Sequence, residues 1–287
     1  MTDCYRHPGR ETGVRCTRCE RPVCPECRVD AAVGFQCLEC VHGAAAVPPP
    51  RVAPPRTAPQ RPGRTDYGGP ARADGALVTR WLIGANLVVW LLAFAGGDGF
   101  FYRLVMQGDA VAASGQWYRM ITSVFLHEPS GFGILHIAMN MWSLWILGPY
   151  VESAVGRLRY LVLYLLSGLG GSALLMLVNP VLVVAGASGA IFGLLGAVVI
   201  IHRHRGFSLG PILAVLVVNL VATFSLGFIA WQAHIGGLVV GALLAAGFVH
   251  APATPAKRRD TVQAAAVALV AALVAGVSLY AAVHIGA

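Results

Sequence analysis

The sequence predicts an all-α polytopic membrane protein preceded by a small metal-binding module. Hydrophobic residues make up 56% of the 287 residues and charged residues only 12%, whereas a soluble domain carries about 25% charged residues. Several long apolar stretches follow residue 76, and all 7 cysteines lie within the first 40 residues. These observations exclude an ordinary soluble enzyme and a disordered chain.

Four regions follow one another along the chain. Residues 1–42 are rich in cysteine, and residues 43–75 are rich in Pro, Ala, Arg and Gly, which predicts a flexible linker without a packed core. Residues 76–250 carry six apolar stretches, and residues 251–287 carry a basic loop followed by a seventh. No apolar run precedes residue 77, so we expect no signal peptide.

The first region predicts a zinc-binding finger. Its ligand-type residues form four pairs, each with a two-residue gap that lets both side chains reach one ion from a tight turn. Eight ligands are enough for two tetrahedral zinc ions, and metal would stabilise a module too small to bury much surface. A disulfide framework is the alternative, which a reducing cytoplasm disfavours. The expected ligands are Cys4, His7, Cys16, Cys19, Cys24, Cys27, Cys37 and Cys40.

The spacing of these pairs resembles that of a B-box-type or related cross-brace zinc finger. The resemblance implies that the first and third pairs hold one ion and that the second and fourth hold the other. His42 is a spare candidate and a bystander in this scheme. Acidic and basic residues are interleaved in the finger. We therefore expect a cytoplasmic protein partner and no nucleic acid, despite the net charge of +8.

The apolar stretches predict seven transmembrane helices, since a span needs about 20 mostly apolar residues. Basic residues precede the first stretch and lie in every second connection after it, whereas the alternate short loops are uncharged. This pattern predicts a multi-pass plasma membrane protein with a cytoplasmic N-terminus and an extracytoplasmic C-terminus. Residues 97–132 are expected to form an interfacial loop with amphipathic pieces. The predicted spans are 77–96, 133–152, 158–178, 187–202, 210–226, 230–249 and 262–284, the fourth and fifth being short.

Polar side chains inside the spans are costly and therefore indicate a functional site. His136 and Asn140 lie one turn apart in the second span, Ser188 opens the fourth, and His234 lies near the start of the sixth. These spans run in the same direction, so at about 1.5 Å per residue all four side chains fall within roughly the outer third of the bilayer. A hydroxyl, two imidazoles and a carboxamide at one depth are typical of a nucleophile, a base and oxyanion donors.

Each of these residues also has a purely structural interpretation. A serine at a helix start is often an N-cap, a membrane histidine or asparagine can bond a neighbouring helix, and Gly237 with Gly241 is a common close-packing pattern. The shared depth favours the functional interpretation, because independent structural roles do not require it. The two glycines would let the sixth span approach the fourth, while Gly186 and Gly189 would leave the backbone around Ser188 open to substrate.

Several motifs occur in a fixed order along residues 77–250. They are Trp117-Tyr118-Arg119, Phe125-Leu126-His127, His136 with Asn140 and Met141, Gly148 with Glu152, Gly186-Ala187-Ser188-Gly189, and His234 with Gly237 and Gly241. In this order and spacing they resemble those of the rhomboid intramembrane serine proteases. The resemblance implies a rhomboid-like six-helix bundle, to which the seventh span is an addition.

The resemblance also implies the roles of individual residues. Ser188 would be the nucleophile and His234 its general base, without a carboxylate to complete a triad. His136, Asn140 and the backbone N–H of Ser188 would bind the oxyanion, and catalysis would need no cofactor. Many members have a tyrosine four residues after the serine that stacks on the catalytic histidine, and Phe192 keeps that stacking face here. The expected substrates are transmembrane proteins in the lipid bilayer, cleaved near the outer face.

Two other functions account for parts of the sequence. A catalytically silent rhomboid-like protein that binds or escorts membrane proteins would share the fold, but the presence of both Ser188 and His234 argues against it. A transporter or channel would need polar groups across the full depth of the bilayer, whereas the inner halves of the spans are apolar and no inverted repeat is visible. The seventh span could brace the bundle or govern access to it.

Overall fold

The computed structural model describes residues 2–42, 63–71, 74–227 and 229–285. The chain divides into two compact units, Met1–Gln60 and Arg61–Ala287. We call the first the N-terminal module and the second the membrane unit. Most of the predicted linker, residues 43–62 and 72–73, lies outside the described residues.

The N-terminal module is built from two small antiparallel sheets and one helical turn. Strand β1 (Thr2–Cys4) pairs with β2 (His7–Thr12), and β3 (Arg28–Asp30) pairs with β4 (Phe35–Cys37), which leads into α1 (Leu38–Val41). All seven cysteines are buried and none forms a disulfide. Apart from the cysteines, the fully buried apolar side chain here is Val23. So small an apolar core agrees with a module that depends on metal for stability.

The elements of the membrane unit that the structure describes are helices, apart from two isolated β-bridges. A helix occupies each of the seven predicted spans. Five of the described helices are long and apolar enough to cross a membrane. They are α2 (Leu77–Leu104), α5 (Phe132–Val155), α6 (Arg157–Val178), α9 (Trp231–Val249) and α10 (Ala256–Ile285). The two stretches predicted to be short form α7 (Ser188–Arg205, 18 residues) and α8 (Gly210–Ser225, 16 residues).

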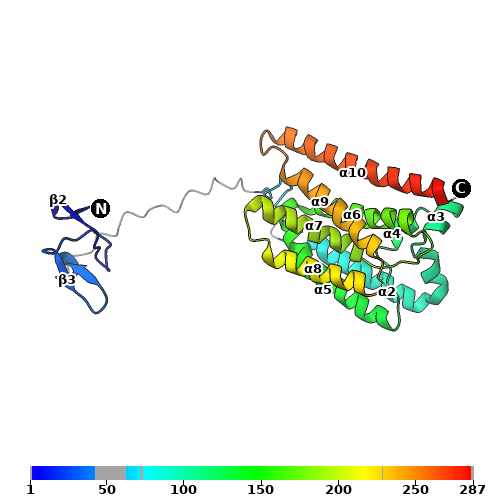
Figure 1. The fold of residues 1–287 in the computed structure, drawn as a ribbon, viewed down its shortest axis with the longest axis horizontal. Helices are drawn as coiled ribbons and strands as arrows, with labels where there is room; N and C mark the ends of the chain where they lie inside the picture. The colour runs from blue at the N-terminus through cyan, green and yellow to red at the C-terminus, as the bar shows by residue number, and fades with distance from the viewer. Residues whose placement is uncertain (1, 43–62, 72–73, 228, 286–287) are drawn as a thin grey trace. The chain divides into compact units, whose positions relative to one another are not determined.

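Helix α7 lies at the centre of this bundle, in contact with α5, α6, α8 and α9, and its buried residues extend along its length. Helix α10 packs along α6 and α9 at one side of the bundle (Figure 1). Near its start, Gln263 Nε2 donates to Phe248 O at 3.0 Å, and Arg159 Nε donates to Gln263 Oε1 at 2.6 Å. The seventh predicted span therefore packs against α6 and α9.

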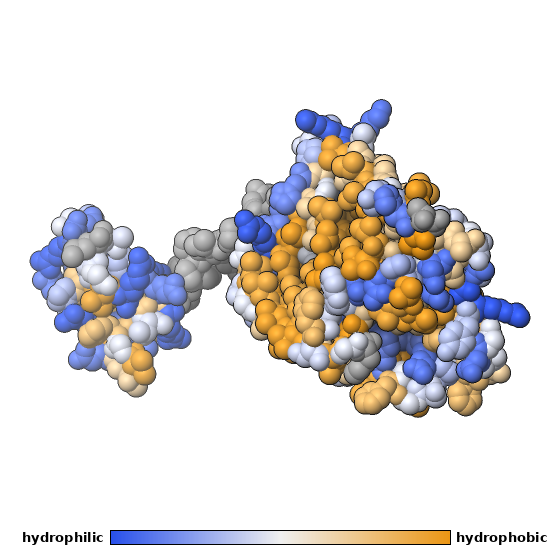
Figure 2. Space-filling view, turned by 45° about the vertical axis from the view of Figure 1, so that its right-hand side comes forward, coloured by the Kyte–Doolittle hydropathy of each residue, from blue (hydrophilic) through white to orange (hydrophobic). Residues whose placement is uncertain are grey.

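A broad hydrophobic surface lies on the face of the membrane unit that Figure 2 shows. It includes large side chains that would be buried in a soluble protein, such as the exposed Trp142 and Trp145 of α5 and Val218 and Phe224 of α8. An apolar surface of this extent is stable against lipid tails and not against water. Together with the five long apolar helices, it identifies a multi-pass membrane protein.

The predicted interfacial loop, residues 97–132, contains short helical pieces. Gly97 breaks α2 with a positive φ of 60°, and α3 (Gly108–Ser114) and α4 (Arg119–Thr122) follow. The Arg119 side chain is 9% exposed and donates from Nη1 to Tyr102 O at 2.7 Å and to Val105 O at 2.9 Å. It thereby binds carbonyl groups at the end of α2, where the helix leaves them without partners.

Residues 63–71, which we call the strap, pack against the helices of the membrane unit. Tyr67 is 7% exposed and belongs to the main hydrophobic core. Its backbone N–H donates to Ala154 O at 3.3 Å, its carbonyl accepts from Gln263 Nε2 at 2.9 Å, and its hydroxyl lies 3.2 Å from His204 Nδ1. The sequence predicts an extended or disordered linker here, whereas the strap is folded against the helices. The reason is that Tyr67 supplies apolar surface to bury within a proline-rich segment.

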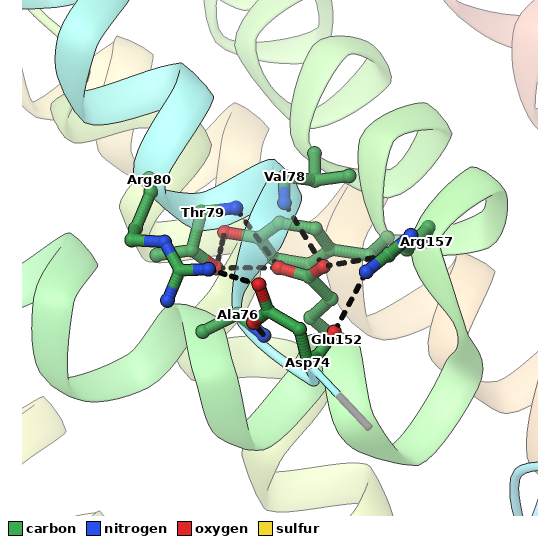
Figure 3. A network of polar contacts seen from close by, with 8 residues as sticks. Asp74, Ala76, Val78, Thr79, Arg80, Glu152 and Arg157 are labelled. Carbon is green, nitrogen blue, oxygen red and sulfur yellow. Dashed lines mark hydrogen bonds and ion pairs between the residues drawn. The ribbon is translucent and has the colours of Figure 1, made fainter. Parts of the chain in front are cut away.

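A buried carboxylate caps the start of α2 (Figure 3). Glu152 of α5 is 2% exposed and accepts from the backbone N–H of Val78 at 3.0 Å and of Thr79 at 2.9 Å. The Thr79 hydroxyl lies 2.9 Å from the same carboxylate, and Arg157 Nε lies 3.8 Å from it. The first N–H groups of a helix have no partner within the helix, so this carboxylate satisfies donors that would otherwise be buried alone.

Asp74 extends the same network outside the span. It accepts from Ala76 N–H at 3.1 Å and pairs with Arg80, and its own carbonyl accepts from Arg157 Nη2 at 2.9 Å (Figure 3). The hydrogen bond from Ala76, assisted by the charge of Arg80, lowers the pKa of Asp74. The network fixes the start of α2 against the junction of α5 and α6.

Candidate functional site

Ser188 is the first residue of α7, at the end of a loop that is fixed on both sides. Two hydrogen bonds join Met106 and Val184 across this loop, at 3.0 and 2.9 Å. Gly186 N–H donates to Ser123 O at 2.9 Å. The φ of Gly186 is +131°, a backbone conformation that is strained for residues with a side chain. The serine hydroxyl thus stands at the N-terminus of a buried helix, where backbone N–H groups have no partner within the helix.

His234 lies on α9, one turn from its start, and is 7% exposed. Its ring stacks on Phe192 of α7 with the ring centroids 4.0 Å apart and the planes 15° from parallel. Phe192 is one helical turn after Ser188 on the same helix, so its contact brings the imidazole to the face of α7 that bears the serine. Among the described contacts, no hydrogen bond joins Ser188 and His234. Catalytic hydrogen bonds are often long before substrate binds.

Glycines allow α7 and α9 to approach closely at this level. A Cβ at Gly237 would collide with the carbonyl oxygen of Gly189, and one at Gly241 would collide with the backbone of Gly193. The two helices therefore touch backbone to backbone just below Ser188 and His234. This is the close approach that the spacing of Gly237 and Gly241 predicts.

His136 of α5 lies against the loop before Ser188. A Cβ at Gly186 would sit 2.6 Å from His136 Cε1 and 3.0 Å from its Nε2. Asn140, one turn along α5, is 5% exposed and donates from Nδ2 to His136 O at 3.0 Å. The structure therefore places His136 beside Gly186, while the hydrogen bond from Asn140 Nδ2 to His136 O stays within α5.

Two residues join the site without a role assigned from the sequence. His127 is fully buried, its Nε2 accepts from Ala187 N–H at 3.5 Å, and its ring lies 5.3 Å from that of His136. Thr223 of α8 is 3% exposed, and its Oγ1 lies 2.7 Å from His234 Nδ1. His127 belongs to a motif noted in the sequence. A threonine in an apolar helix gives little signal by itself, and the polar Asn219, one turn before Thr223, is the feature of the sequence that could have drawn attention to it.

A small cavity of about 20 Å³ lies beside the serine, which is room for about one water molecule. Its lining includes Ser188, Gly189, Ser123 and Ser172. Hydroxyl and carbonyl groups of this kind are the partners that a buried water needs. The site can therefore hold a water within the bundle close to the Ser188 hydroxyl.

The comparisons with known proteins concern this part of the chain. The sequence model of the rhomboid domain matches residues 114–251, which contain Ser188, His234, His136 and Asn140. The chain contains a rhomboid domain. Relatives named as proteases of this family agree with the match.

Two of these relatives come from Bacillus subtilis. "Rhomboid protease GluP" is 39% identical over 118 residues, which are 40% of this chain and 22% of the relative. "Putative rhomboid protease YdcA" is 32% identical over 122 residues, which are 42% of this chain and 59% of the relative. "RHOMBOID-like protein 1" of Arabidopsis thaliana is 43% identical over 82 residues, 29% of this chain and 20% of the relative. The matches thus span less than two thirds of these relatives' own lengths.

A separate candidate site lies in the N-terminal module. The eight predicted ligands gather into two groups of four, in each of which the ligand atoms all lie within 4.8 Å of one another. His7 Nδ1 is 3.3 Å from Cys24 Sγ and 3.4 Å from Cys27 Sγ, and Cys19 Sγ is 3.6 Å from Cys37 Sγ. Ligand atoms around a tetrahedral zinc ion lie about 3.5–3.8 Å apart, so the donor sets fit zinc.

The grouping follows the cross-brace order. The first and third pairs form one group and the second and fourth form the other, while His42 belongs to neither. The groups are Cys4, His7, Cys24 and Cys27, and Cys16, Cys19, Cys37 and Cys40. Each group links segments that are distant in sequence, so a metal ion in it would hold the strands of the module together.

Proposed function

We propose that the rhomboid domain of this chain is an intramembrane serine endopeptidase that cleaves transmembrane segments of membrane proteins. In this proposal Ser188 is the nucleophile and His234 is its general base. The observation that carries the proposal is the stacking of His234 on Phe192, one turn beyond Ser188, where α7 and α9 touch. Helix packing alone does not require a buried imidazole at that place, and burying an ionisable group in a membrane is costly, which supports a chemical role.

The reaction would proceed through an acyl-enzyme. His234 Nε2 takes the proton of Ser188 as Oγ attacks the peptide carbonyl, and then gives that proton to the leaving amine as the C–N bond breaks. A water molecule next gives a proton to His234 and attacks the ester carbonyl. The bond between the acyl carbon and Oγ then breaks, the acid leaves, and His234 returns the proton to Oγ, which restores Ser188. The cavity lined by Ser188 and Ser172 is a place where such a water could wait.

Charge that develops on the carbonyl oxygen would be stabilised at the start of α7. The backbone N–H of Ser188 points from a helix N-terminus, whose dipole favours negative charge. His136, beside Gly186, would donate from its ring, and Asn140 Nδ2 carries a second hydrogen besides the one it gives to His136 O. Gly186 would leave room for the substrate backbone to approach these donors.

The substrate would be a helix that unwinds locally. A transmembrane helix shields its carbonyls through its own hydrogen bonds, so small residues and nearby helix breakers would favour cleavage. Basic residues lie at the helix ends opposite Ser188, including Arg157, Arg203 and Lys257. By the positive-inside rule, Ser188 would lie near the outer face of the membrane, with the N-terminus in the cytoplasm and the C-terminus outside, and we propose that this is the plasma membrane.

The N-terminal module would bind two zinc ions and, from the cytoplasmic side, a protein partner. Its eight ligands fit two tetrahedral sites. The ions would be structural, since four protein ligands leave no open position for chemistry.

The test of the proposed function is cleavage of a single-span substrate in proteoliposomes. Ser188→Ala should abolish cleavage and labelling by a fluorophosphonate probe, while its thermal unfolding stays as in the wild type. Ser225→Ala is the matched control, because Ser225 is an exposed serine on α8, and it should cleave normally. Cleavage retained in Ser188→Ala would rule out this nucleophile, and a wild-type chain that neither cleaves nor labels would favour a silent membrane-protein binding role.

A further inference from the structure

A hydroxyl of α8 contacts the imidazole that the proposed function makes the general base. Thr223 Oγ1 lies 2.7 Å from His234 Nδ1 and, on its other side, 2.7 Å from Asn219 O. Both Thr223 and His234 are buried, at 3% and 7% exposure. Water therefore competes little for these bonds, and their direction determines which ring nitrogen carries the proton.

The direction follows from counting hydrogens. A threonine hydroxyl has one hydrogen to donate, and a backbone carbonyl such as Asn219 O can only accept. If Thr223 gave its hydrogen to His234, two oxygens with lone pairs would face each other at 2.7 Å. When Thr223 instead donates to Asn219 O, its oxygen is free to accept from Nδ1–H. Both contacts are then hydrogen bonds, and the neutral ring has its lone pair on Nε2.

The helix that supplies this hydroxyl is the least embedded of the bundle. Ile212 and Thr223 are its buried residues, whereas neighbours such as Val218, Val221 and Phe224 are exposed. The Thr223–His234 bond is therefore one of few points at which α8 is fixed to the helices that carry the site.

We propose that Thr223 is a positioning residue that holds His234 in the Nδ1–H tautomer, with Nε2 unprotonated and ready to accept the Ser188 proton. The inference rests on the proposed function for its catalytic meaning, and on the hydrogen-bond geometry for the tautomer itself. The wrong tautomer would place a proton where the base needs a lone pair, and the imidazole could then not act. The state of the base also depends on α8 remaining seated against α9.

The kinetic test compares three variants of the full-length protein. Thr223→Val keeps the shape and removes the acceptor, Thr223→Ser keeps the hydroxyl, and Ser225→Ala removes an exposed hydroxyl from the same helix. Thr223→Val should lose about tenfold in fluorophosphonate labelling rate and in kcat, as expected for one buried hydrogen bond, with KM unchanged. Thr223→Ser should stay within about twofold of the wild type, and Ser225→Ala should equal it.

The tautomer test does not depend on activity. The protein is labelled with ¹⁵N-histidine, which gives signals from all 9 histidines. The signals that disappear in His234→Gln are assigned to His234. Nδ1 should have the shift of a protonated ring nitrogen and Nε2 that of an unprotonated one, and Thr223→Val should lose this bias. A wild-type Nε2–H tautomer, or unchanged kinetics in Thr223→Val, would overturn the inference. A chain that never labels but shows the Nδ1–H tautomer would instead contradict only the proposed function.

Discussion

His234 contacts other residues through both its ring face and its Nδ1 edge. Phe192 covers one face of the imidazole at 4.0 Å between centroids, and Thr223 binds Nδ1 at 2.7 Å. These contacts come from two different helices, α7 and α8, so each restricts a different motion of the ring. The remaining nitrogen, Nε2, is the one left for chemistry.

Replacing Phe192 tests the stacking contact. Phe192→Ala should lower kcat for a model single-span substrate by about two- to tenfold, because an aromatic pair contributes about 0.5–1.5 kcal/mol to holding the ring. Phe192→Tyr keeps the face and should cleave nearly as the wild type does. Phe94→Ala, which removes an exposed phenylalanine of α2, is the control. Equal cleavage by Phe192→Ala and the control would show that stacking does not position His234.

Helices α7 and α9 come into close contact because glycines, which have no side chain, line their interface. Gly237 and Gly241 face the backbone of Gly189 and Gly193, with no room for a Cβ at either position. In a membrane, where apolar burial gives little drive between helices, such backbone approach is a main source of packing energy. The element that carries the serine and the element that carries the imidazole are therefore joined most tightly next to the site.

The same substitution at two glycines tests this packing. Gly241→Ala should destabilise the protein by about 1–3 kcal/mol, because the new methyl group must push α7 and α9 apart. Gly84→Ala places a methyl group in open space on α2 and should be neutral or stabilising by up to about 1 kcal/mol. Unfolding in detergent, followed by circular dichroism, measures both. Equal stability of the two variants would contradict the packing argument.

At the scale of the whole molecule, a measurement of zinc content tests the N-terminal module independently of the membrane unit. The wild-type protein should contain two zinc ions per chain by elemental analysis, and Cys27→Ser and Cys37→Ser, one from each group, should each lower the content. Thermal unfolding of the membrane unit should not change in either variant, since the units are separate compact bodies. Two zinc ions in both variants, or none in the wild type, would contradict the assignment.

Much of this architecture was predictable because its signals are local. Apolar stretches of about 20 residues locate the helices. The two-residue gaps between Cys4 and His7 and between the later cysteines predict the eight ligands, and the resemblance to a cross-brace finger implies the two groups into which they gather. The polar residues that open α7 and α9 stand out against apolar surroundings. Gly237 likewise predicts the contact that it makes with α7.

The features that the sequence left unassigned depend on contacts between distant segments. Thr223 is an ordinary helix residue until α8 is placed beside His234, 11 residues away across a loop. Helical structure resumes after Gly97, whose non-helical backbone kinks α2 at that residue, so α2 reaches Leu104, past the predicted limit at residue 96. Tyr67 lies in a segment whose composition predicts a linker, and only the docking surface formed by Ala154, His204 and Gln263 explains its burial.

The strap also sets a boundary for anyone who wishes to separate the two units. A protein shortened to begin at residue 76, just before the first apolar stretch, would leave the Gln263 amide without one of its acceptors and open a hollow where the Tyr67 ring belongs. The cut belongs at or before residue 61, where the compact body begins. A shortened protein that keeps the strap retains the segment that contacts α5, α7 and α10.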